Sequence, residues 1–340
     1  MFVGICDFPG AYAFPPSGYG GIERWLWAVA VGARKAVEDV HLLGPQWRSE
    51  LAEEWPLRSI RLEDTKPGSK HAAALKAAGY DLLVVGHEYP SLSPWRAAWE
   101  VLDCDVVTFQ HWPYFRHKYG AFDGVQARLY CYSEEMRTRY AAHRPITELA
   151  VHLGLDEGVM PARSGDSLLW MGRIDTEKAP HLAIRAARLL GRKIIVAGPV
   201  FDTAYVDAHR ADFAADHVTL VGEVGGPTKA GLLAEASALI YTCARGYIEA
   251  GAASFGESLR AGTPVAALAW RPGSCSHAAL CERTGHVAQV ETAADDDHVA
   301  QALAETIEKT HLLCAAEVQD VGLARFDPVR HFRSLATRQC

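Results

Sequence analysis

The stretch of sequence that decides the fold is residues 167–191, SLLWMGRIDTEKAPHLAIRAARLLG. It opens with a short, continuous apolar run that ends at Gly172, as expected of a strand covered on both faces of a parallel sheet. Pro180 stands at a plausible first helical position, apolar residues then recur at helical spacing, and Gly191 is a natural C-terminal stop. The stretch therefore predicts a strand, a polar turn and a helix, which is the repeating unit of an α/β fold.

The same alternation of apolar runs and helical patterns continues along the whole chain. The predicted strands of the first half are residues 2–8, 41–44, 81–86, 105–111, 128–133 and 148–153. Those of the second half are residues 167–173, 193–197, 218–222, 238–243, 264–268 and 286–290. A polar segment punctuated by Gly and Pro, DEGVMPARSGD at residues 156–166, separates the two series and is the predicted linker.

We therefore expect an α/β protein of two Rossmann-like, doubly wound domains, residues 1–156 and 157–326, that face a cleft. The loops after the strands would line that cleft, so the residues that carry the chemistry are expected in these loops. Residues 327–340 begin with a possible Asp cap followed by Pro and predict a C-terminal helix. The sequence leaves its packing partner open, the first domain included.

Composition excludes several classes of protein. The 340 residues carry 41 acidic side chains against 34 Lys and Arg, a formal net charge of −7, which disfavours a broad nucleic-acid or anionic-membrane surface. No run reaches about 18 consecutive apolar residues, and the N-terminus, MFVGICDFPG, lacks the basic region of a signal peptide. The eight Cys show no paired zinc spacing. We expect a cytoplasmic protein with no metal site, no nucleic-acid partner and no strong membrane signal.

Two cations follow the predicted strand at residues 167–173. Arg173 and Lys178 lie five residues apart, and a guanidinium fork together with an ammonium can clamp a diphosphate. Two solvated loop cations are the alternative. In the first half, Gly20 and Gly21 precede a predicted helix and would let an anion reach its free N-terminal amides, or would simply form a tight turn.

Carboxylates and a histidine provide further candidates. Glu249 and Glu257 could accept hydrogen bonds from sugar or ribose hydroxyls, and the small residues up to Ala253 could let phosphate oxygens reach free amides. Ser254 and Glu257 also match the S-x-x-E capping box, which the residues alone favour. His111 ends a predicted strand, a suitable place for a ligand contact, although a lone histidine is more often structural.

The order of these segments resembles one family of enzymes. The pattern consists of Gly-Gly-x-Glu (Gly20, Gly21, Glu23), a strand-end histidine (His111), G-R-x-D-x-x-K (Gly172, Arg173, Asp175, Lys178), E-x7-E (Glu249, Glu257) and A-G-T-P-V at residues 261–265. It resembles the retaining GT-B glycosyltransferases of family 4 over nearly the whole chain, and it is similar to sugar-transferring enzymes of antibiotic assembly.

The resemblance implies the GT-B fold, with the acceptor on the first domain and the donor on the second. It implies a retaining, metal-independent transferase that moves a hexose or related sugar from a nucleoside-diphosphate sugar, UDP being favoured, in natural-product or oligosaccharide biosynthesis. The acceptor would be a sugar or a natural product, and no cofactor is expected. The implied catalytic residues beside the sugar are His111 and Glu249. The implied donor-binding residues are Gly20, Gly21, Arg173, Lys178, Ala253 and Ser254 at the phosphates, Glu257 at the ribose, and the loop from Gly222 to Val224 at the base.

Two departures from the family pattern lie near the expected donor sugar. Gly251 and Ala252 replace the aromatic–Gly pair that usually follows the first Glu, and His277 stands where an acidic residue is usual. An unusual sugar would fit these changes. The alternatives are a GT-B epimerase or phosphorylase, and a non-catalytic nucleotide-sugar-binding assembly protein. An NAD-dependent dehydrogenase is disfavoured, because the first loop lacks the dinucleotide spacing.

Overall fold

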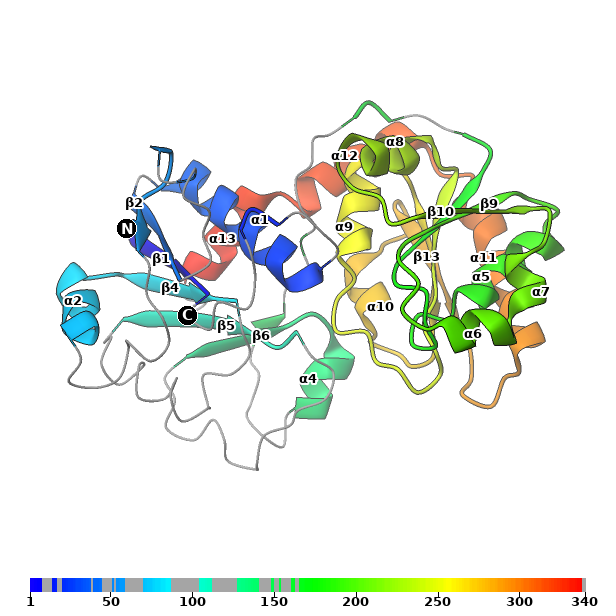
Figure 1. Ribbon diagram of the computed structural model, residues 1–340, viewed down its shortest axis with the longest axis horizontal. Helices are drawn as coiled ribbons and strands as arrows, with labels where there is room; N and C mark the ends of the chain where they lie inside the picture. Colours follow the sequence, from blue (N-terminus) through cyan, green and yellow to red (C-terminus); the bar gives the residue numbers. More distant parts are fainter. Residues whose placement is uncertain are drawn as a thin grey trace. The chain divides into compact units, whose positions relative to one another are not determined.

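The structure is a computed structural model of the chain, and it divides into two compact units. Unit 1 comprises Met1–Leu155 together with Asp327–Cys340, and unit 2 comprises Asp156–Phe326. Figure 1 labels the elements of both units. The structure describes residues 1–7, 14–16, 20–37, 39–44, 51, 53–58, 70–86, 104–111, 127–140, 148–149, 153, 160–162 and 165–337. Most of the predicted linker at residues 156–166 therefore lies outside the described residues.

Unit 1 is built on a parallel sheet of seven described strands in the order β3-β2-β1-β4-β5-β6-β7. This is the strand order of a Rossmann domain, with one strand added at the far edge. The strands are β1 (Phe2–Cys6), β2 (Asp39–Leu43), β3 (Leu57–Arg58), β4 (Leu82–Val85), β5 (Asp105–Phe109), β6 (Arg128–Cys131) and β7 (Glu148–Leu149). The described helices of this unit are α1 (Gly21–Ala36), α2 (Lys70–Ala78), α4 (Glu134–Tyr140) and α13 (Pro328–Ala336).

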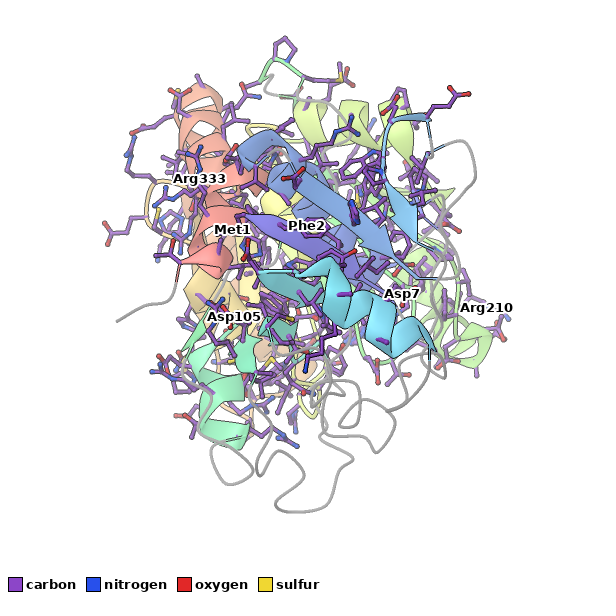
Figure 2. All side chains as sticks on the ribbon, turned by 90° about the vertical axis from the view of Figure 1, so that its left-hand side faces the viewer. Met1, Phe2, Asp7, Asp105, Arg210 and Arg333 are labelled. Atoms are coloured by element: carbon purple, nitrogen blue, oxygen red, sulfur yellow. The ribbon has the colours of Figure 1, made fainter. Side chains whose placement is uncertain are left out.

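The C-terminal helix α13 packs beside α1, so it belongs to unit 1 (Figure 1). Its predicted start is confirmed, because the Asp327 side chain accepts a hydrogen bond from the Arg330 N–H at 2.6 Å. Figure 2, which faces unit 1, places Arg333 on this helix. The two helices approach closely at Gly32, where an added Cβ would collide with the backbone carbonyl of Pro328. The absence of a side chain at Gly32 is therefore a condition for this packing.

Unit 2 contains a second parallel sheet, of six strands in the order β10-β9-β8-β11-β12-β13. This order is again that of a Rossmann domain. The strands are β8 (Leu168–Met171), β9 (Ile194–Ala197), β10 (Val218–Gly222), β11 (Ala238–Tyr241), β12 (Val265–Ala269) and β13 (Gly285–Gln289). The helices are α5 (Pro180–Leu189), α6 (Thr203–Ala208), α7 (Arg210–Phe213), α8 (Gly226–Glu235), α9 (Ala253–Arg260), α10 (Cys275–Ala279), α11 (Asp296–Thr310) and α12 (Ala315–Arg325).

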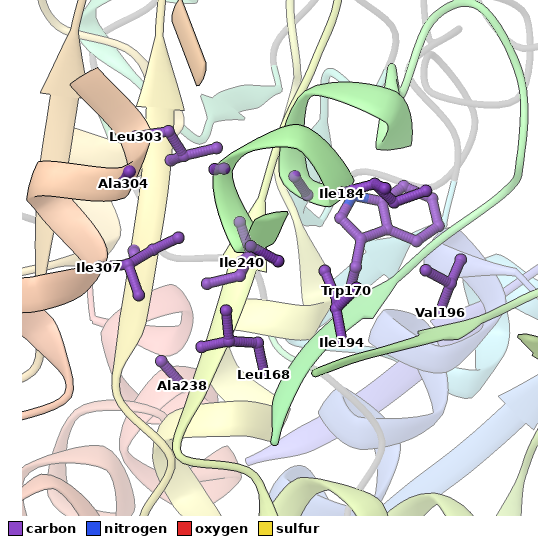
Figure 3. Close-up of a cluster of buried hydrophobic side chains, with 14 of the residues drawn as sticks. Leu168, Trp170, Ile184, Ile194, Val196, Ala238, Ile240, Leu303, Ala304 and Ile307 are labelled. Atoms are coloured by element: carbon purple, nitrogen blue, oxygen red, sulfur yellow. The ribbon is translucent and has the colours of Figure 1, made fainter. Parts of the chain in front are cut away.

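Helices cover both faces of this second sheet, with α5, α7 and α11 on one side and α9 and α10 on the other (Figure 1). Figure 3 shows the apolar core on the α5 and α11 side. Its members include Leu168, Trp170, Ile184, Ile194, Val196, Ala238, Ile240, Leu303, Ala304 and Ile307, all nearly or fully buried. The fold prediction of two Rossmann-like α/β domains is confirmed, and each of the twelve predicted strands is present. The two-residue edge strand β3 was missed.

The helix predicted after β8 begins and ends where the sequence indicated. Pro180 opens α5, and Gly191 follows it with φ +62°. The N–H of Gly191 donates to the Arg188 carbonyl at 3.0 Å and the N–H of Arg192 donates to the Ala187 carbonyl at 3.0 Å. These two bonds form a Schellman motif, which satisfies carbonyls that the helix end leaves open.

The first turn of α5 contains a buried histidine, His181, that links it to neighbouring helices. His181 Nδ1 lies 2.5 Å from the Tyr205 hydroxyl, its Nε2 lies 3.1 Å from an oxygen of Asp296, and its ring stacks on His209 at 3.9 Å between centroids. Burial, helped by the neighbouring His209 and opposed by Asp296, lowers the pKa of His181 to about 4. The folded protein therefore holds this imidazole neutral at neutral pH.

We predict that Gly32→Ala lowers the free energy of unfolding by about 1–3 kcal/mol, because overpacking forces α1 and α13 apart. Urea unfolding measures the change. Gly231→Ala in α8 is the matched control, since an added Cβ there meets nothing within 4 Å. It should be neutral or stabilise by up to about 1 kcal/mol through helix propensity. A Gly32→Ala protein as stable as the parent would contradict the close approach.

We also predict an acid-sensitive contribution from His181. Because its folded pKa lies below the value of an exposed histidine, stability is complete above about pH 6.5 and falls as the pH drops toward 4. The loss between pH 7.5 and pH 5 should be about 2 kcal/mol from this group. Urea unfolding of His181→Gln at both pH values should show that part of the pH dependence removed. The exposed His298→Gln in α11 is the control and should keep the parent's pH dependence; an unchanged slope in His181→Gln would refute the assignment.

Candidate functional site

The strand order of unit 2 identifies where a ligand site is expected. The strands β8 and β11 are neighbours, yet the chain leaves β8 toward β9 on one side and leaves β11 toward β12 on the other. Open α/β sheets bind ligands beyond the carboxyl ends of the strands at such a switch point. Arg173 and Lys178 follow β8, and Glu249 follows β11. The topology thus brings three of the predicted site residues to one edge of the sheet.

Arg173 is partly exposed and already faces carboxylates. Its Nη2 donates to Oε2 of Glu177 at 2.8 Å, and its Nη1 lies 3.3 Å from Oδ2 of Asp175. The guanidinium also lies 5.5 Å from the centre of the Phe201 ring. About a quarter of the Arg173 side chain, 27%, is exposed to solvent.

Lys178 is held more tightly and is largely buried. Its ammonium pairs with Oε2 of Glu249, and the two side chains are 13% and 10% exposed. The Tyr241 hydroxyl donates to the same Glu249 oxygen at 3.0 Å, and the ammonium lies 4.9 Å from the centre of the Tyr247 ring. The alternative of a solvated loop cation is therefore wrong for Lys178.

The backbone around Lys178 is fixed from both central strands. The Lys178 N–H donates to Oδ1 of Asp175 at 2.9 Å, and the Lys178 carbonyl accepts from the Thr242 hydroxyl at 2.7 Å. Thr242 in turn accepts from Nε1 of Trp170 in β8 at 2.9 Å. Ala179 has φ +45°, a left-handed conformation that a non-glycine residue rarely adopts. Strain of this kind persists where surrounding contacts over-determine the backbone, as they do here.

The phenol and thiol groups around Glu249 stay protonated. Burial first, and the negative charge of Glu249 second, raises the pKa of Tyr241, Tyr247, Cys243 and Cys275, to about 12 for Cys243. Neutral thiols are poor nucleophiles, so these cysteines are packing residues rather than reactive ones.

The capping-box prediction for Ser254 and Glu257 is wrong. The helix α9 has its N-cap at Ala252, with no side-chain cap, because the small residues after Glu249 carry the chain directly into the first turn. The Glu257 carboxylate instead meets Lys229 of α8, with Nζ 2.6 Å from Oε1 and both side chains 8% exposed. Ala253 and Ser254 lie in the first turn, where backbone amides point away from the helix.

Lys229 is a residue of this site that the sequence did not predict. It lies one helical turn before the buried Leu233, so it shares the buried face of α8. A lysine at a core position is costly unless it is paired, and that position was the available signal. Its partner Glu257, 28 residues away, could not be read from the sequence.

The loop predicted to face a nucleobase starts where β10 ends. Gly222 has φ +71°, which favours glycine, and its carbonyl accepts the Gly198 N–H at 2.7 Å. A Cβ at Gly222 or at Gly225, the N-cap of α8, would meet nothing within 4 Å. Val224 between them is half-buried. The backbone here is therefore accessible.

The predicted site residues of unit 1 are Gly20, Gly21 and His111. They also follow strands at the carboxyl edge of their sheet, the edge at which Asp7 follows β1 (Figure 2). Gly20 is the N-cap of α1, and a Cβ there would collide with the carboxylate of Glu23. Burial raises the pKa of Glu23. The first turn of α1, which begins at Gly21, thus already carries an acidic group, the type of charge that a helix N-terminus attracts.

His111 follows β5 and packs against α1 about one turn beyond the start of that helix. It is 9% exposed, its Nδ1 lies 3.1 Å from the Tyr132 hydroxyl, and its ring centre lies 5.0 Å from that of Trp25 in α1. Since Trp25 is four residues after Gly21, the structure brings the strand-end histidine close to the start of α1. Its imidazole is oriented by Tyr132 rather than solvated.

The described part of the chain contains neither a metal-binding cluster nor a helix suited to span a membrane. No group of three or more His, Cys, Asp and Glu side chains is arranged to hold a metal ion among the residues that the structure describes. None of the helices described here has the length and apolar character needed to cross a membrane.

Comparison with solved structures shows the fold. The chain is similar to AviGT4, a glycosyltransferase involved in avilamycin A biosynthesis, with a TM-score of 0.72 and 20% identity over 99% of this chain and 98% of that one. It is similar to Anabaena HepE, solved in complex with UDP and glucose, with a TM-score of 0.67 and 15% identity over 94% and 96% of the two chains. WaaG, a glycosyltransferase involved in lipopolysaccharide biosynthesis, has a TM-score of 0.59 and 14% identity over 98% of each chain.

These structural neighbours are GT-B glycosyltransferases, and this chain shares their fold of two Rossmann-like domains. No protein-family model matches the sequence, and no curated protein matches it.

The buried pair of Lys229 and Glu257 yields a stability prediction. Lys229→Met removes the ammonium from a buried carboxylate and should cost about 3–5 kcal/mol of unfolding free energy. Lys229→Met combined with Glu257→Met removes both charges and should recover most of that loss. Urea unfolding of the three proteins measures the coupling. The exposed pair Arg210–Asp207 supplies the control, Arg210→Met, which should change stability by less than about 0.5 kcal/mol. A Lys229→Met protein close to the parent would contradict a buried, coupled pair.

Proposed function

We propose that the protein is a glycosyltransferase that moves a sugar from a nucleoside-diphosphate sugar, UDP being favoured, to a sugar or natural-product acceptor. The transfer would retain the configuration of the sugar and need no metal. The observation that carries the proposal is the placement of Arg173 and Lys178, two unlike cations, beyond β8 at the switch point of unit 2. The fold shared with solved glycosyltransferases, and with HepE solved in complex with UDP and glucose, supports it.

The cations would stabilise the leaving group. As the bond from the anomeric carbon to the phosphate oxygen breaks, negative charge develops on the departing diphosphate. The guanidinium of Arg173 can form a fork with two phosphate oxygens, and the ammonium of Lys178 supplies a compact charge. Groups that are fixed before the reaction need no reorganisation, and such preorganised donors are worth about 3–4 kcal/mol each. The hydrogen bonds that fix the Lys178 backbone serve this purpose.

The remaining donor contacts follow from α9 and α8. The first turn of α9, at Ala253 and Ser254, has no side-chain cap and can offer amides to a phosphate. The ammonium of Lys229 donates to Oε1 of Glu257, so the second carboxylate oxygen can accept a hydrogen bond from a ribose hydroxyl. The accessible backbone from Gly222 to Val224 would contact the base.

The retaining step would need no separate base from the protein. The acceptor hydroxyl attacks the anomeric carbon on the face that the diphosphate leaves, its oxygen forms the new glycosidic bond, and its proton passes to the departing phosphate oxygen. His111 and Glu249, the predicted residues beside the sugar, would orient the hydroxyls and the developing charge. Unit 2 would supply the donor contacts other than those of Gly20 and Gly21, and unit 1 the acceptor contacts.

Nucleotide binding tests the proposal, by calorimetry and thermal shift with UDP, GDP, dTDP and NAD, each with and without EDTA. UDP at about 100 times its Kd should stabilise the protein by about 2.7 kcal/mol, a shift of several degrees. Arg173→Ala should weaken UDP binding about tenfold or more, since a charge-assisted hydrogen bond contributes about 1.5–3 kcal/mol. The exposed Arg210→Ala is the matched control and should bind UDP as the parent does.

Other outcomes separate the alternatives. A response to NAD, or to none of the four compounds, would reject the donor site, and a response abolished by EDTA would reject metal independence. Release of UDP from UDP-sugars with acceptor present, and α-linkage of the product from an α-linked donor by NMR, would support a retaining transferase. Sugar phosphate formed in the presence of inorganic phosphate would favour a phosphorylase, and tight binding without turnover would favour an assembly protein.

A further inference from the structure

We propose that Tyr241 is a positioning residue for Lys178, acting through Glu249, so that the ammonium is directed before the donor diphosphate binds. This inference rests on the proposed function, because it deepens the role of the donor site. Tyr241 is the last residue of β11 and is 6% exposed. The sequence presents it as one more apolar residue of a strand, in the run ALIYTC.

The geometry places one carboxylate oxygen between two donors. The Tyr241 hydroxyl donates to Oε2 of Glu249 at 3.0 Å, and the ammonium of Lys178 meets the same oxygen. The phenol therefore fixes the carboxylate, and the carboxylate fixes the ammonium. Because burial and the charge of Glu249 raise the pKa of Tyr241 well above its usual value, the phenol remains a hydrogen-bond donor at every working pH.

Such an anchor is needed because neither charged group is rigid by itself. A lysine side chain carries about 2 kcal/mol of rotamer entropy, which a phosphate contact must overcome unless the side chain is already ordered. Glu249 lies outside the helices and strands, between β11 and α9. The segment before it is braced at its backbone: Nε1 of Trp270 donates to the Cys243 carbonyl at 2.7 Å, and Nη2 of Arg271 donates to the Tyr247 carbonyl at 2.9 Å. The Tyr241 hydrogen bond extends this bracing to the carboxylate itself.

This arrangement gives Glu249 a second role in addition to the sugar contact that the sequence implies. An ammonium has three N–H donors, so Lys178 can keep its ion pair with Glu249 and still donate hydrogen bonds to a phosphate. Glu249 then acts on the donor through Lys178. The two roles differ in one measurable respect: UDP has no sugar, so a pure sugar contact at Glu249 would leave UDP affinity unchanged.

Calorimetric titration with UDP tests the proposal in a double-mutant cycle of the parent, Tyr241→Phe, Lys178→Gln and the double variant. Tyr241→Phe should weaken UDP binding about 3- to 10-fold, the equivalent of one hydrogen bond. It should have no further effect, within twofold, once Lys178 is Gln. Glu249→Ala should weaken UDP about tenfold or more, and Glu249→Gln, whose amide oxygen still accepts from Tyr241, should recover part of that loss.

Tyr205→Phe is the matched control, because it also deletes a buried phenol hydroxyl, one that bonds to His181 instead. It should bind UDP as the parent does. Urea unfolding of every variant establishes that each is folded, and the Glu249 variants keep the test valid if Tyr241→Phe does not fold. Equal UDP affinity in Tyr241→Phe and the parent, the same loss in both Lys178 backgrounds, or unchanged UDP affinity in Glu249→Ala would overturn the positioning role and leave the donor site intact. A parent protein that binds none of the nucleoside diphosphates would overturn the proposed function and this inference with it.

Discussion

The ion pair between Lys178 and Glu249 joins the two loops that meet at the switch point of unit 2, and the site depends on it. Removing two charges from water is costly, and their attraction repays that cost only with additional hydrogen bonds. Tyr241 supplies such a hydrogen bond, the Tyr247 ring adds a cation–π contact, and the Thr242 bond to the Lys178 carbonyl fixes the backbone on the other side. The pair therefore holds together the loops that follow β8 and β11 at the edge where a ligand is expected.

The carboxylates that pair with the cations of this site limit how strongly an anionic ligand can bind. The cations Arg173, Lys178 and Lys229 each face at least one carboxylate of the protein. A diphosphate must share these cations with the carboxylates already there, so part of its Coulombic attraction is offset by repulsion. For the proposed glycosyltransferase, this arrangement favours moderate nucleotide binding and release after transfer, because strong uniform binding of substrate and transition state does not raise the rate of the chemical step.

Local patterns predicted the fold well, and long-range pairing limited the prediction of the site. Apolar runs identified the strands because a parallel sheet buried on both faces demands them, whereas β3, two residues at an edge, leaves no such pattern. The start of α13 was predictable because the Asp327 cap is local. The capping box failed because Lys229, far away in sequence, takes the carboxylate of Glu257. In the same way, Tyr241 could not be told from an apolar strand residue until its hydroxyl was seen on Glu249.

The departures from the family pattern at Gly251, Ala252 and His277 have consequences in the structure, beginning with the start of α9. With Gly251 and Ala252 in place of a larger pair, no side chain from these positions covers the first turn, and the helix begins without a side-chain cap. An uncapped turn leaves amides that a ligand's phosphate can satisfy, so the small residues favour anion binding at this end. The residue His277 is bonded to Ser274 at 2.9 Å and can donate or accept as its tautomer changes, which the usual carboxylate cannot. For the proposed transferase, a hydroxyl pattern suited to an acidic residue would therefore not be matched here, and the selectivity for the transferred sugar would depend on this histidine rather than on the diphosphate contacts.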